Sequence, residues 1–378
     1  MAPTPDAYWL ALRRVRGVGP RIARLLLEHF GAPQAVFAAG EEDLVRTGIP
    51  RTTAHSIRIF ADFEPIEKEL CELPRIGARL IRWSDDDYPV NLRQIADPPP
   101  YFFIRGVLTA GDPKCVAVVG ARLASDAGRR MAQRLGLELA AKNFTVVSGL
   151  ARGIDSEAHQ GALDARGRTV AVMGCGIDII YPPENRQLAE AIVEGGGALI
   201  SELPVGTPPV AQNFPGRNRL ISGLCLGVVI VEAAEKSGSL ITARMALEQD
   251  RQVFAVPGSP LTGRSRGSNR LLKEGARLVE CVEDVIEDLA PQMGEGLAAA
   301  AIANAAGPAG QNSGPASFES ETDEAKTILG YLKIDNRLHI DSIIERSKLS
   351  TQTVLRLLLE LELRGLVTQH PGKLFSLA

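Results

Sequence analysis

The chain has 378 residues, of which 45% are hydrophobic and 23% are charged, and its formal net charge at pH 7 is −3. This length allows two or three globular domains with a real core, and the ordinary charge content argues against extended disorder. No apolar run is long enough for a membrane helix, and the first residues lack the pattern of a secretory signal, so we expect a cytoplasmic protein that does not insert into membranes. The five cysteines are scattered without a CxxC pair, which indicates reduced core thiols and no metal site.

Residues 1–75 are predicted to form a small helical domain. Apolar residues recur at roughly helical spacing around two turns, at 17–20 and 31–33. The first turn, Gly17-Val18-Gly19-Pro20, resembles the hairpin of a helix-hairpin-helix, in which backbone amides can meet a DNA phosphate. A glycine-rich turn between two core helices also occurs without any ligand, so the structural and the DNA-binding interpretation both stay open.

Residues 80–289 repeat strand, glycine turn and helix, which predicts an α/β fold with a parallel, Rossmann-like sheet. The usual dinucleotide fingerprint is absent, and we expect no cofactor. Small residues follow the strands, and ligands of such sheets bind beyond the carboxyl ends of the strands. These turns should therefore line one shared crevice. The expected strands are 115–119, 144–147, 169–173, 198–201, 228–232 and 253–256.

Two arginines, Arg217 and Arg219, precede a continuous apolar run and should lie on a helix start or a loop at the mouth of this crevice. The stretch 213–275 holds nine basic and five acidic residues, although the whole chain is slightly acidic. A local basic surface on such a chain is typical of a protein that binds a phosphate backbone. Arginines two apart on a helix edge are also common at a solvated rim, and the local charge favours the first interpretation.

Glycine turns after the first strands are predicted to bind a phosphate. Glycine lets the backbone approach a phosphate closely, and a helix that begins directly afterwards presents unpaired amides. Arg122, at the end of a buried strand, is expected to make a charge-assisted contact with a phosphate in the same crevice. Asp155 is expected to be the N-cap of the next helix and not a catalytic residue. The residues of the predicted phosphate-binding turn are Gly120, Ser148, Gly149 and Gly153.

A low-complexity tract at 290–320, rich in Ala, Gly and Pro, cannot bury a core and is predicted to be a flexible linker. Residues 321–378 should form a winged helix. Its third predicted helix carries acidic as well as basic residues, so contact with duplex DNA and contact with a protein partner both stay open. The predicted helices are 324–332, 340–347 and 351–365, followed by a hairpin at 366–377.

Ordered motifs along nearly the whole chain resemble those of the DprA/Smf family, the DNA-processing proteins of natural transformation. The family usually has Gly-Ser-Arg where this chain has Gly120-Ala121-Arg122, which loses one hydroxyl and keeps the arginine. The other matching motifs are Asp87-Tyr88-Pro89 with Asp97-Pro98-Pro99, Ser148-Gly149-Leu150-Ala151-Arg152-Gly153-Ile154-Asp155 with His159, Tyr181-Pro182 with Asn185, Ser201-Glu202, Phe214-Pro215-Gly216-Arg217-Asn218-Arg219, Ser237-Gly238-Ser239-Leu240-Ile241-Thr242-Ala243, and Val256-Pro257-Gly258 with Asn269.

The resemblance implies a recombination mediator, not an enzyme, which binds incoming single-stranded DNA, shields it from nucleases and loads the RecA recombinase. It also implies a homodimer built through the Rossmann-like core, with a SAM-like N-terminal domain over residues 1–75. Single-strand binding needs a positive groove and flat side chains on which bases stack. Phe214 is the candidate stacking residue, although a phenylalanine before a proline is more often simply core. The DNA-binding residues carried over from the family's motifs are Arg122, Arg217, Asn218, Arg219, Lys236 and Arg244.

An enzyme of another class is the alternative. Nucleotide hydrolases of the LOG family have a related fold but carry a Pro-Gly-Gly-x-Gly-Thr motif, where this chain has Val256-Pro257-Gly258-Ser259-Pro260. Ser148, Asp155 and His159 could suggest a hydrolase. However, no nucleophile elbow surrounds the serine, and an aspartate and a histidine four apart on a helix are commonly capping and surface contacts. We therefore expect no catalytic residue.

Overall fold

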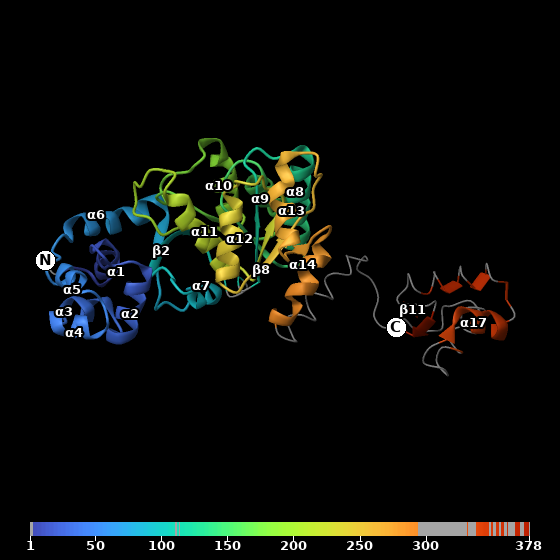
Figure 1. Ribbon diagram of the computed structural model, residues 1–378, viewed down its shortest axis with the longest axis horizontal. Coiled ribbons are helices and arrows are strands. Elements are labelled where there is room, and N and C mark those ends of the chain that lie inside the picture. Colours follow the sequence, from blue (N-terminus) through green and yellow to red (C-terminus); the bar gives the residue numbers. More distant parts are fainter. Residues whose placement is uncertain are drawn as a thin grey trace. The chain divides into compact units, whose positions relative to one another are not determined.

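Two compact units, Met1–Gly307 and Pro308–Ala378, divide the chain in the computed structural model (Figure 1). In the first unit the structure describes residues 3–109, 112 and 114–293. Most of the predicted linker therefore lies outside the described residues. In the second unit the described residues are 331, 338–347, 349–350, 353–354, 357–358, 361, 367–370 and 374–377.

Helices make up the N-terminal part of the first unit. The two predicted turns are confirmed, because Gly17 and Gly31 have φ angles of 88° and 78°, a left-handed region that favours glycine. Pro20 and Pro33 each begin the next helix, where the missing amide proton costs nothing. Between residues 5 and 72, all of them described, the helices are α1 (Pro5–Arg14), α2 (Pro20–Phe30), α3 (Pro33–Ala38), α4 (Glu41–Arg46), α5 (Arg51–Arg58) and α6 (Glu64–Glu72).

A nine-stranded sheet forms the centre of the described part of the first unit, in the order β1-β2-β6-β5-β4-β3-β7-β8-β9. The six predicted strands are confirmed to within two residues at their ends, and β3 to β9 run parallel. These strands are β3 (Cys115–Val119), β4 (Thr145–Ser148), β5 (Thr169–Val172), β6 (Ala198–Ser201), β7 (Gly227–Ile230), β8 (Gln252–Ala255) and β9 (Arg277–Leu278).

Two antiparallel strands, β1 (Ala78–Arg82) and β2 (Tyr101–Gly106), extend the sheet beside β6 and were not predicted. They carry the helical N-terminal part, because Phe103 of β2 belongs to the same apolar cluster as Leu10 and Leu26. An ion pair between Arg82 and Asp6 adds to this contact. The N-terminal helices are therefore packed onto one end of the sheet within the first unit.

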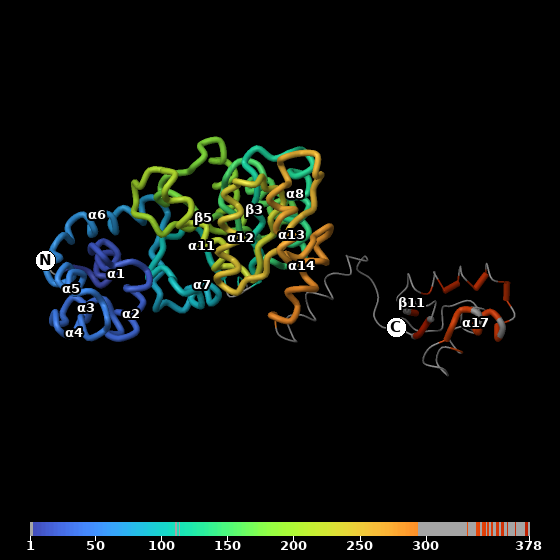
Figure 2. The backbone as a smooth tube through the Cα atoms, in the orientation of Figure 1, coloured from blue at the N-terminus to red at the C-terminus, as the bar shows by residue number. Residues whose placement is uncertain are grey.

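Helices cover both faces of the parallel strands (Figures 1 and 2). Val116 and Val118 of β3 face α8, α9 and α14, whereas Ala117 and Val119 face α7, α11 and α12. A strand buried on both faces explains the continuous apolar runs in the sequence. The helices are α7 (Val90–Gln94), α8 (Asp126–Ala141), α9 (Ile154–Asp164), α10 (Arg186–Glu194), α11 (Asn213–Leu224), α12 (Ser239–Glu248), α13 (Arg266–Lys273) and α14 (Val282–Leu289), with 3₁₀ turns at 73–76, 183–185, 263–265 and 290–293.

The described residues of the second unit agree with a winged helix. The predicted second helix is confirmed as α17 (Ile340–Ser347), and the predicted hairpin as β11 (Val367–His370) and β12 (Leu374–Leu377). A short strand, β10 (Leu338–His339), pairs with β12. The other two predicted helices lie largely outside the described residues. Across the described parts of both units, no helix combines the length and apolar character that crossing a membrane requires.

Helices α8 and α9 pack backbone against backbone. A Cβ atom at Gly161 would overlap the carbonyl oxygen of Gln133, and one at Gly136 would overlap the carbonyl oxygen of Ala158. No flexible side chain could move aside, because the atoms concerned belong to the backbone. The two glycines therefore set the distance between these helices.

The variant Gly161→Ala is expected to lower the free energy of unfolding by about 1–3 kcal/mol, the usual cost of overpacking. Alanine favours a helix over glycine by about 1 kcal/mol, but the overlap with Gln133 outweighs this gain. Urea unfolding measures the difference. Gly263→Ala serves as the control, because a Cβ there would meet no atom within 4 Å. Equal stability of the two variants would contradict the close helix packing.

A fully buried histidine, His159, joins α9 to the sheet. Its Nδ1 lies 2.6 Å from Oγ1 of Thr169, whose hydroxyl already donates to the carbonyl oxygen of Val146. The hydroxyl oxygen must therefore accept a hydrogen bond from Nδ1–H, which leaves Nε2 of the neutral ring unprotonated and without a partner among the described residues. Burial, and to a smaller extent the charge of Arg217, lower the pKa of His159 to about 3.

This histidine is expected to make the protein less stable as the pH falls. Its pKa is lower in the folded than in the unfolded chain, so its contribution is complete above pH 6.5 and is lost as the pH falls toward 3. One such group costs about 1.4 kcal/mol per pH unit, or about 2 kcal/mol between pH 6.5 and 5. Urea unfolding over this range should show a shallower slope for His159→Gln. His55→Gln, at a position that is 61% exposed, should keep the slope of the wild type.

Candidate functional site

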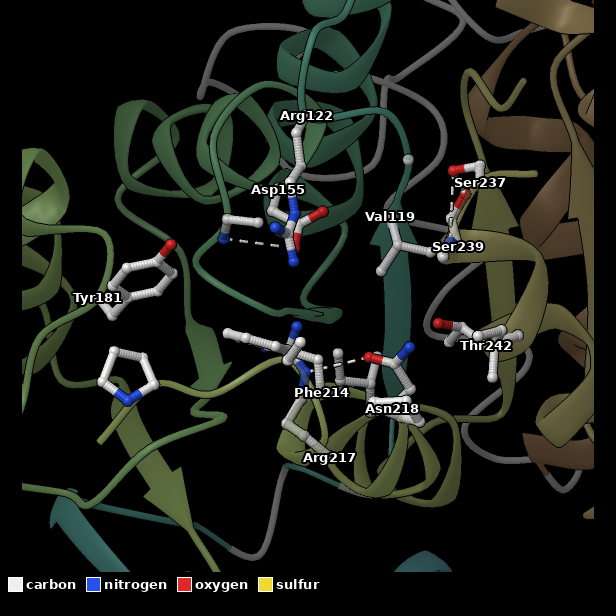
Figure 3. A pocket seen from close by; sticks show the side chains of 18 residues that line it. Val119, Arg122, Asp155, Tyr181, Phe214, Arg217, Asn218, Ser237, Ser239 and Thr242 are labelled. Carbon is white, nitrogen blue, oxygen red and sulfur yellow. Dashed lines mark hydrogen bonds between the residues drawn. The ribbon is translucent and has the colours of Figure 1, made fainter. Parts of the chain in front are cut away.

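A crevice of about 580 Å³ lies beyond the carboxyl ends of β3 and β4 and beside the starts of α11 and α12 (Figure 3). The predicted shared crevice is thus confirmed for the turns after β3, β4 and β7. The turn after β8 instead lines a second pocket, of about 780 Å³, with the start of α8. The lining residues of the first crevice that carry its chemistry are Gly120, Arg122, Ala151, Asp155, Tyr181, Phe214, Arg217, Asn218, Ser237, Ser239 and Thr242.

Arg217 lies on α11 and is only 6% exposed. One of its terminal nitrogens donates to the carbonyl oxygen of Gly149 at 2.7 Å and to that of Val172 at 2.5 Å, and its Nε donates to Oδ1 of Asn218. Burial lowers the pKa of this arginine, whereas the nearby Asp155 raises it. Arg217 therefore ties α11 to the ends of β4 and β5 and leaves a buried positive charge at the floor of the crevice.

The glycine turn after β4 is closed by an internal carboxylate. Asp155 Oδ2 accepts the amide of Gly149 at 3.1 Å and that of Ala151 at 3.4 Å. The prediction of Asp155 as an N-cap was wrong, because α9 begins at Ile154 and Gly153 precedes it. Burial raises the pKa of Asp155, against the opposing effects of Arg217 and of these amides. Binding of a phosphate by this turn stays a prediction, and it would require Asp155 to release its donors.

The glycines of the predicted phosphate turn also have packing roles. A Cβ atom at Gly149 would overlap the guanidinium group of Arg217. One at Gly120 would lie 2.7 Å from Cγ1 of Ile154, and Gly153 has a φ angle of 75°. Ser148 is fully buried, and its hydroxyl donates to the carbonyl oxygen of Val118. Close approach of backbone and side chains within the protein thus accounts for each of these small residues.

Arg122 is the free cation of the crevice. Its side chain is exposed and has no hydrogen bond or ion pair with any residue that the structure describes. Its guanidinium carbon lies 5.1 Å above the ring centre of Phe214, and Arg217 lies 5.7 Å from the same centre. Tyr181 stands 6.0 Å away on another side of Phe214 (Figure 3). Both predicted arginines, Arg122 and Arg217, therefore lie against the ring of the predicted Phe214.

Hydroxyl groups at the start of α12 form the wall opposite Tyr181 (Figure 3). The hydroxyls of Ser237 and Ser239 lie 2.8 Å apart, and the buried Thr242 follows one turn later. The first turn of this helix has no acidic residue, so its positive end is not neutralised locally. Lys236 and Arg244 are exposed beside this wall and do not line the crevice. A role for them in binding stays a prediction.

Arg219 lies outside the crevice. It is buried, pairs with Glu202, and donates to the carbonyl oxygen of Asp97 at 2.8 Å. The sequence predicted that Arg217 and Arg219 would lie together at the mouth of the crevice. They lie on one helix, but residues two apart point in different directions around a helix. Arg219 links α11 to the loop before β2, and contact with DNA stays a prediction that its present partners do not favour.

No hydrolytic triad is assembled. Ser148, Asp155 and His159 bond to Val118, to backbone amides and to Thr169, and none of these bonds joins two of the three. The expectation that Asp155 and His159 make surface contacts was wrong, because both are buried. Within the described residues no group of three or more His, Cys, Asp or Glu side chains could hold a metal ion.

The predicted turn with Ser237 and Ser239 does line the crevice, but sequence reasoning missed the contributions of Tyr181 and Thr242. Both lie in motifs that carried the resemblance, so a signal was present. Their place around Phe214 depends on how the long connection after β5 folds back over the sheet. Neither composition nor spacing predicts that path.

Three family models match the chain. The model of the DNA recombination-mediator protein A matches residues 79–290, and the model of the DprA winged helix domain matches residues 312–373. A SAM-like helix-hairpin-helix tandem matches residues 10–62. Together these matches cover the helical N-terminal part, the sheet and the C-terminal unit.

Sequence and structure comparisons with individual proteins point to the same family. Protein Smf of Synechocystis is 33% identical over 98% of both chains. DNA processing protein A from Streptococcus pneumoniae superposes with a TM-score of 0.65 at 34% identity, covering 75% of this chain and 97% of that one. The same protein from Helicobacter pylori, whose structure gives insights into its single-stranded DNA binding mode, has a TM-score of 0.51 at 29% identity and covers 57% and 96%. The chain therefore belongs to the DNA recombination-mediator protein A family.

Proposed function

We propose that this protein binds single-stranded DNA in the crevice and acts as a recombination mediator that protects the strand and loads RecA on it. The observation that carries the proposal is the free guanidinium group of Arg122 held 5.1 Å above the ring of Phe214, with the buried Arg217 behind it. A cation beside an aromatic ring offers one contact for a phosphate and another for a base.

An unpaired strand fits these groups better than a duplex does. Phe214 and Tyr181 can stack only on a base whose face is exposed, and paired bases hide their faces from side chains. Arg122 and the start of α12, with Ser237 and Ser239, supply charge and donors for the backbone. None of these contacts reads a base edge, so binding with little sequence preference is expected.

Arg217 supports the site indirectly in this proposal. Its hydrogen bonds go to Gly149, Val172 and Asn218, and its charge reaches the crevice from below. Removing it would leave carbonyl oxygens without donors and Asp155 without its nearest positive charge, so loss of binding in Arg217→Ala would not separate binding from folding. Arg122 and Phe214 are the better positions for a test.

The salt dependence of binding to a labelled oligothymidine, measured by fluorescence anisotropy, tests this proposal. Arg122→Ala should weaken binding and reduce the slope of log affinity against log salt by about 0.7, the value of one phosphate contact on a single strand. Phe214→Ala should cost about 1–3 kcal/mol, a loss of about 5-fold to 150-fold, because one stacked base is lost.

Arg75→Ala is the matched control. Arg75 is an exposed arginine just before β1, whose first residue, Ala78, pairs with Arg105 at the opposite edge of the sheet. Its variant removes the same charge and should bind like the wild type. Equal binding by the Arg122→Ala and Arg75→Ala variants would refute the crevice as the site, and absence of binding by the wild type would refute the function.

The proposed partners follow from family membership. RecA loading predicts that the protein speeds assembly of RecA filaments on single strands coated with a single-strand binding protein, and that Arg122→Ala loses this effect. Fluorescence of labelled RecA on the coated strand measures the rate. Strand binding without faster assembly would refute loading and leave binding intact.

A homodimer through the sheet core is proposed as well, and light scattering should then give twice the chain mass.

A further inference from the structure

Two hairpins in the N-terminal part are built alike. The first hairpin, residues 15–19, joins α1 to α2, and the second hairpin, residues 47–50, joins α4 to α5. Each contains a glycine with positive φ, 88° at Gly17 and 92° at Gly48. A buried aliphatic residue follows each glycine, Val18 in the first and Ile49 in the second. The two hairpins therefore present similar backbones at the surface.

Arginines flank both hairpins, but the charges of the second are neutralised. Arg46 donates to Oδ1 of Asp43 at 2.9 Å. Arg51 pairs with Glu41 at 3.3 Å and with Glu42. All three carboxylates belong to α4, the helix that enters this hairpin. The positive charges beside the second hairpin are therefore neutralised by carboxylates of the adjoining helix.

The first hairpin is compensated only in part. Between Asp6 and Glu28 the sequence has five arginines and no acidic residue. Three of these arginines have partners, since Arg14 pairs with Glu69, Arg24 pairs with Glu28, and Arg13 donates to the carbonyl oxygen of Val18. The other two, Arg16 and Arg21, are exposed and make no hydrogen bond or ion pair with any described residue.

A loop connects this end of α1 with the crevice. The buried carboxylate of Glu69 pairs with Arg14 and accepts the amide of Val205 at 2.8 Å. From Val205 the chain continues to Pro209 and Ala211, which line the crevice. The six residues from Val205 to Ala211 span at most about 21 Å, which about six nucleotides of a strand can cover. A strand that also reaches the hairpin must be longer than this.

We propose that the first hairpin is a second contact for the backbone of the single strand that occupies the crevice, made by Arg16 and Arg21. This inference rests on the proposed function, because the strand must first be bound in the crevice. Two free guanidinium groups in a stretch without acidic residues attract a polyanion, whereas the similar but neutralised second hairpin does not. The contact is to phosphates and does not depend on sequence.

Anisotropy with oligothymidines of 5 and 20 nucleotides tests the inference on the full chain. The double variant Arg16→Ala/Arg21→Ala should bind the 5-mer like the wild type and bind the 20-mer with a salt slope reduced by about 1.4, the value of two phosphate contacts. Arg46→Ala/Arg51→Ala removes the same total charge from the second hairpin and should leave both slopes unchanged. Circular dichroism confirms that the variants are folded, which is expected because Arg16 and Arg21 have no partners to lose.

The outcomes separate the two proposals. If the first-hairpin variant binds the 20-mer like the wild type, or if both hairpin variants lose the same slope, the inference is refuted. If Arg122→Ala leaves binding unchanged and the first-hairpin variant loses it, the hairpin is a DNA contact and the crevice is not. If the wild type binds neither oligonucleotide, the proposed function fails and the inference fails with it.

Discussion

The buried guanidinium group of Arg217 is the contact on which the crevice depends. It joins α11 to the carbonyl oxygens of Gly149 and Val172, at the ends of two adjacent parallel strands. A charge in such a place is costly unless it is compensated, and here carbonyl oxygens and the nearby Asp155 compensate it. Gly149 has no side chain because the guanidinium group occupies that space. Phe214 and Arg122 then lie above this floor, with the ring of Phe214 in contact with both arginines.

Partners decide which arginines of this protein can bind an anion. Arg217 and Arg219 are two residues apart on one helix, yet the first reaches the crevice and the second is taken by Glu202 and Asp97. The same distinction separates the two N-terminal hairpins, whose backbones are similar and whose arginines differ in having or lacking carboxylate neighbours. On a chain of net charge −3, attraction of a polyanion to a given surface depends on whether the cations of that surface are left unpaired.

The antiparallel strands β1 and β2 extend the parallel sheet at the edge formed by β6. They were missed because the run Tyr101-Phe102-Phe103-Ile104 follows three prolines and does not belong to the repeated pattern of strand, glycine turn and helix. The pairing of β2 with β6 joins strands that are far apart in the sequence. Once formed, they provide the surface on which the N-terminal helices pack, and so bring the first hairpin near the loop that runs to the crevice.

Much of the fold was determined by local sequence. Continuous apolar runs followed by glycines predicted six parallel strands, and the turns at Gly17 and Gly31 predicted the helix ends, because a strand buried on both faces and a turn with positive φ each restrict the residue types at their own positions. The motifs also identified the family. Only the tertiary structure decided which side chains meet in the crevice. In the folded chain Asp155 accepts the amides of the turn, Arg219 pairs with Glu202, and Arg122 lies over the ring of Phe214. The partners of long polar side chains are distant in sequence, so they are determined by how the whole sheet and its helices pack.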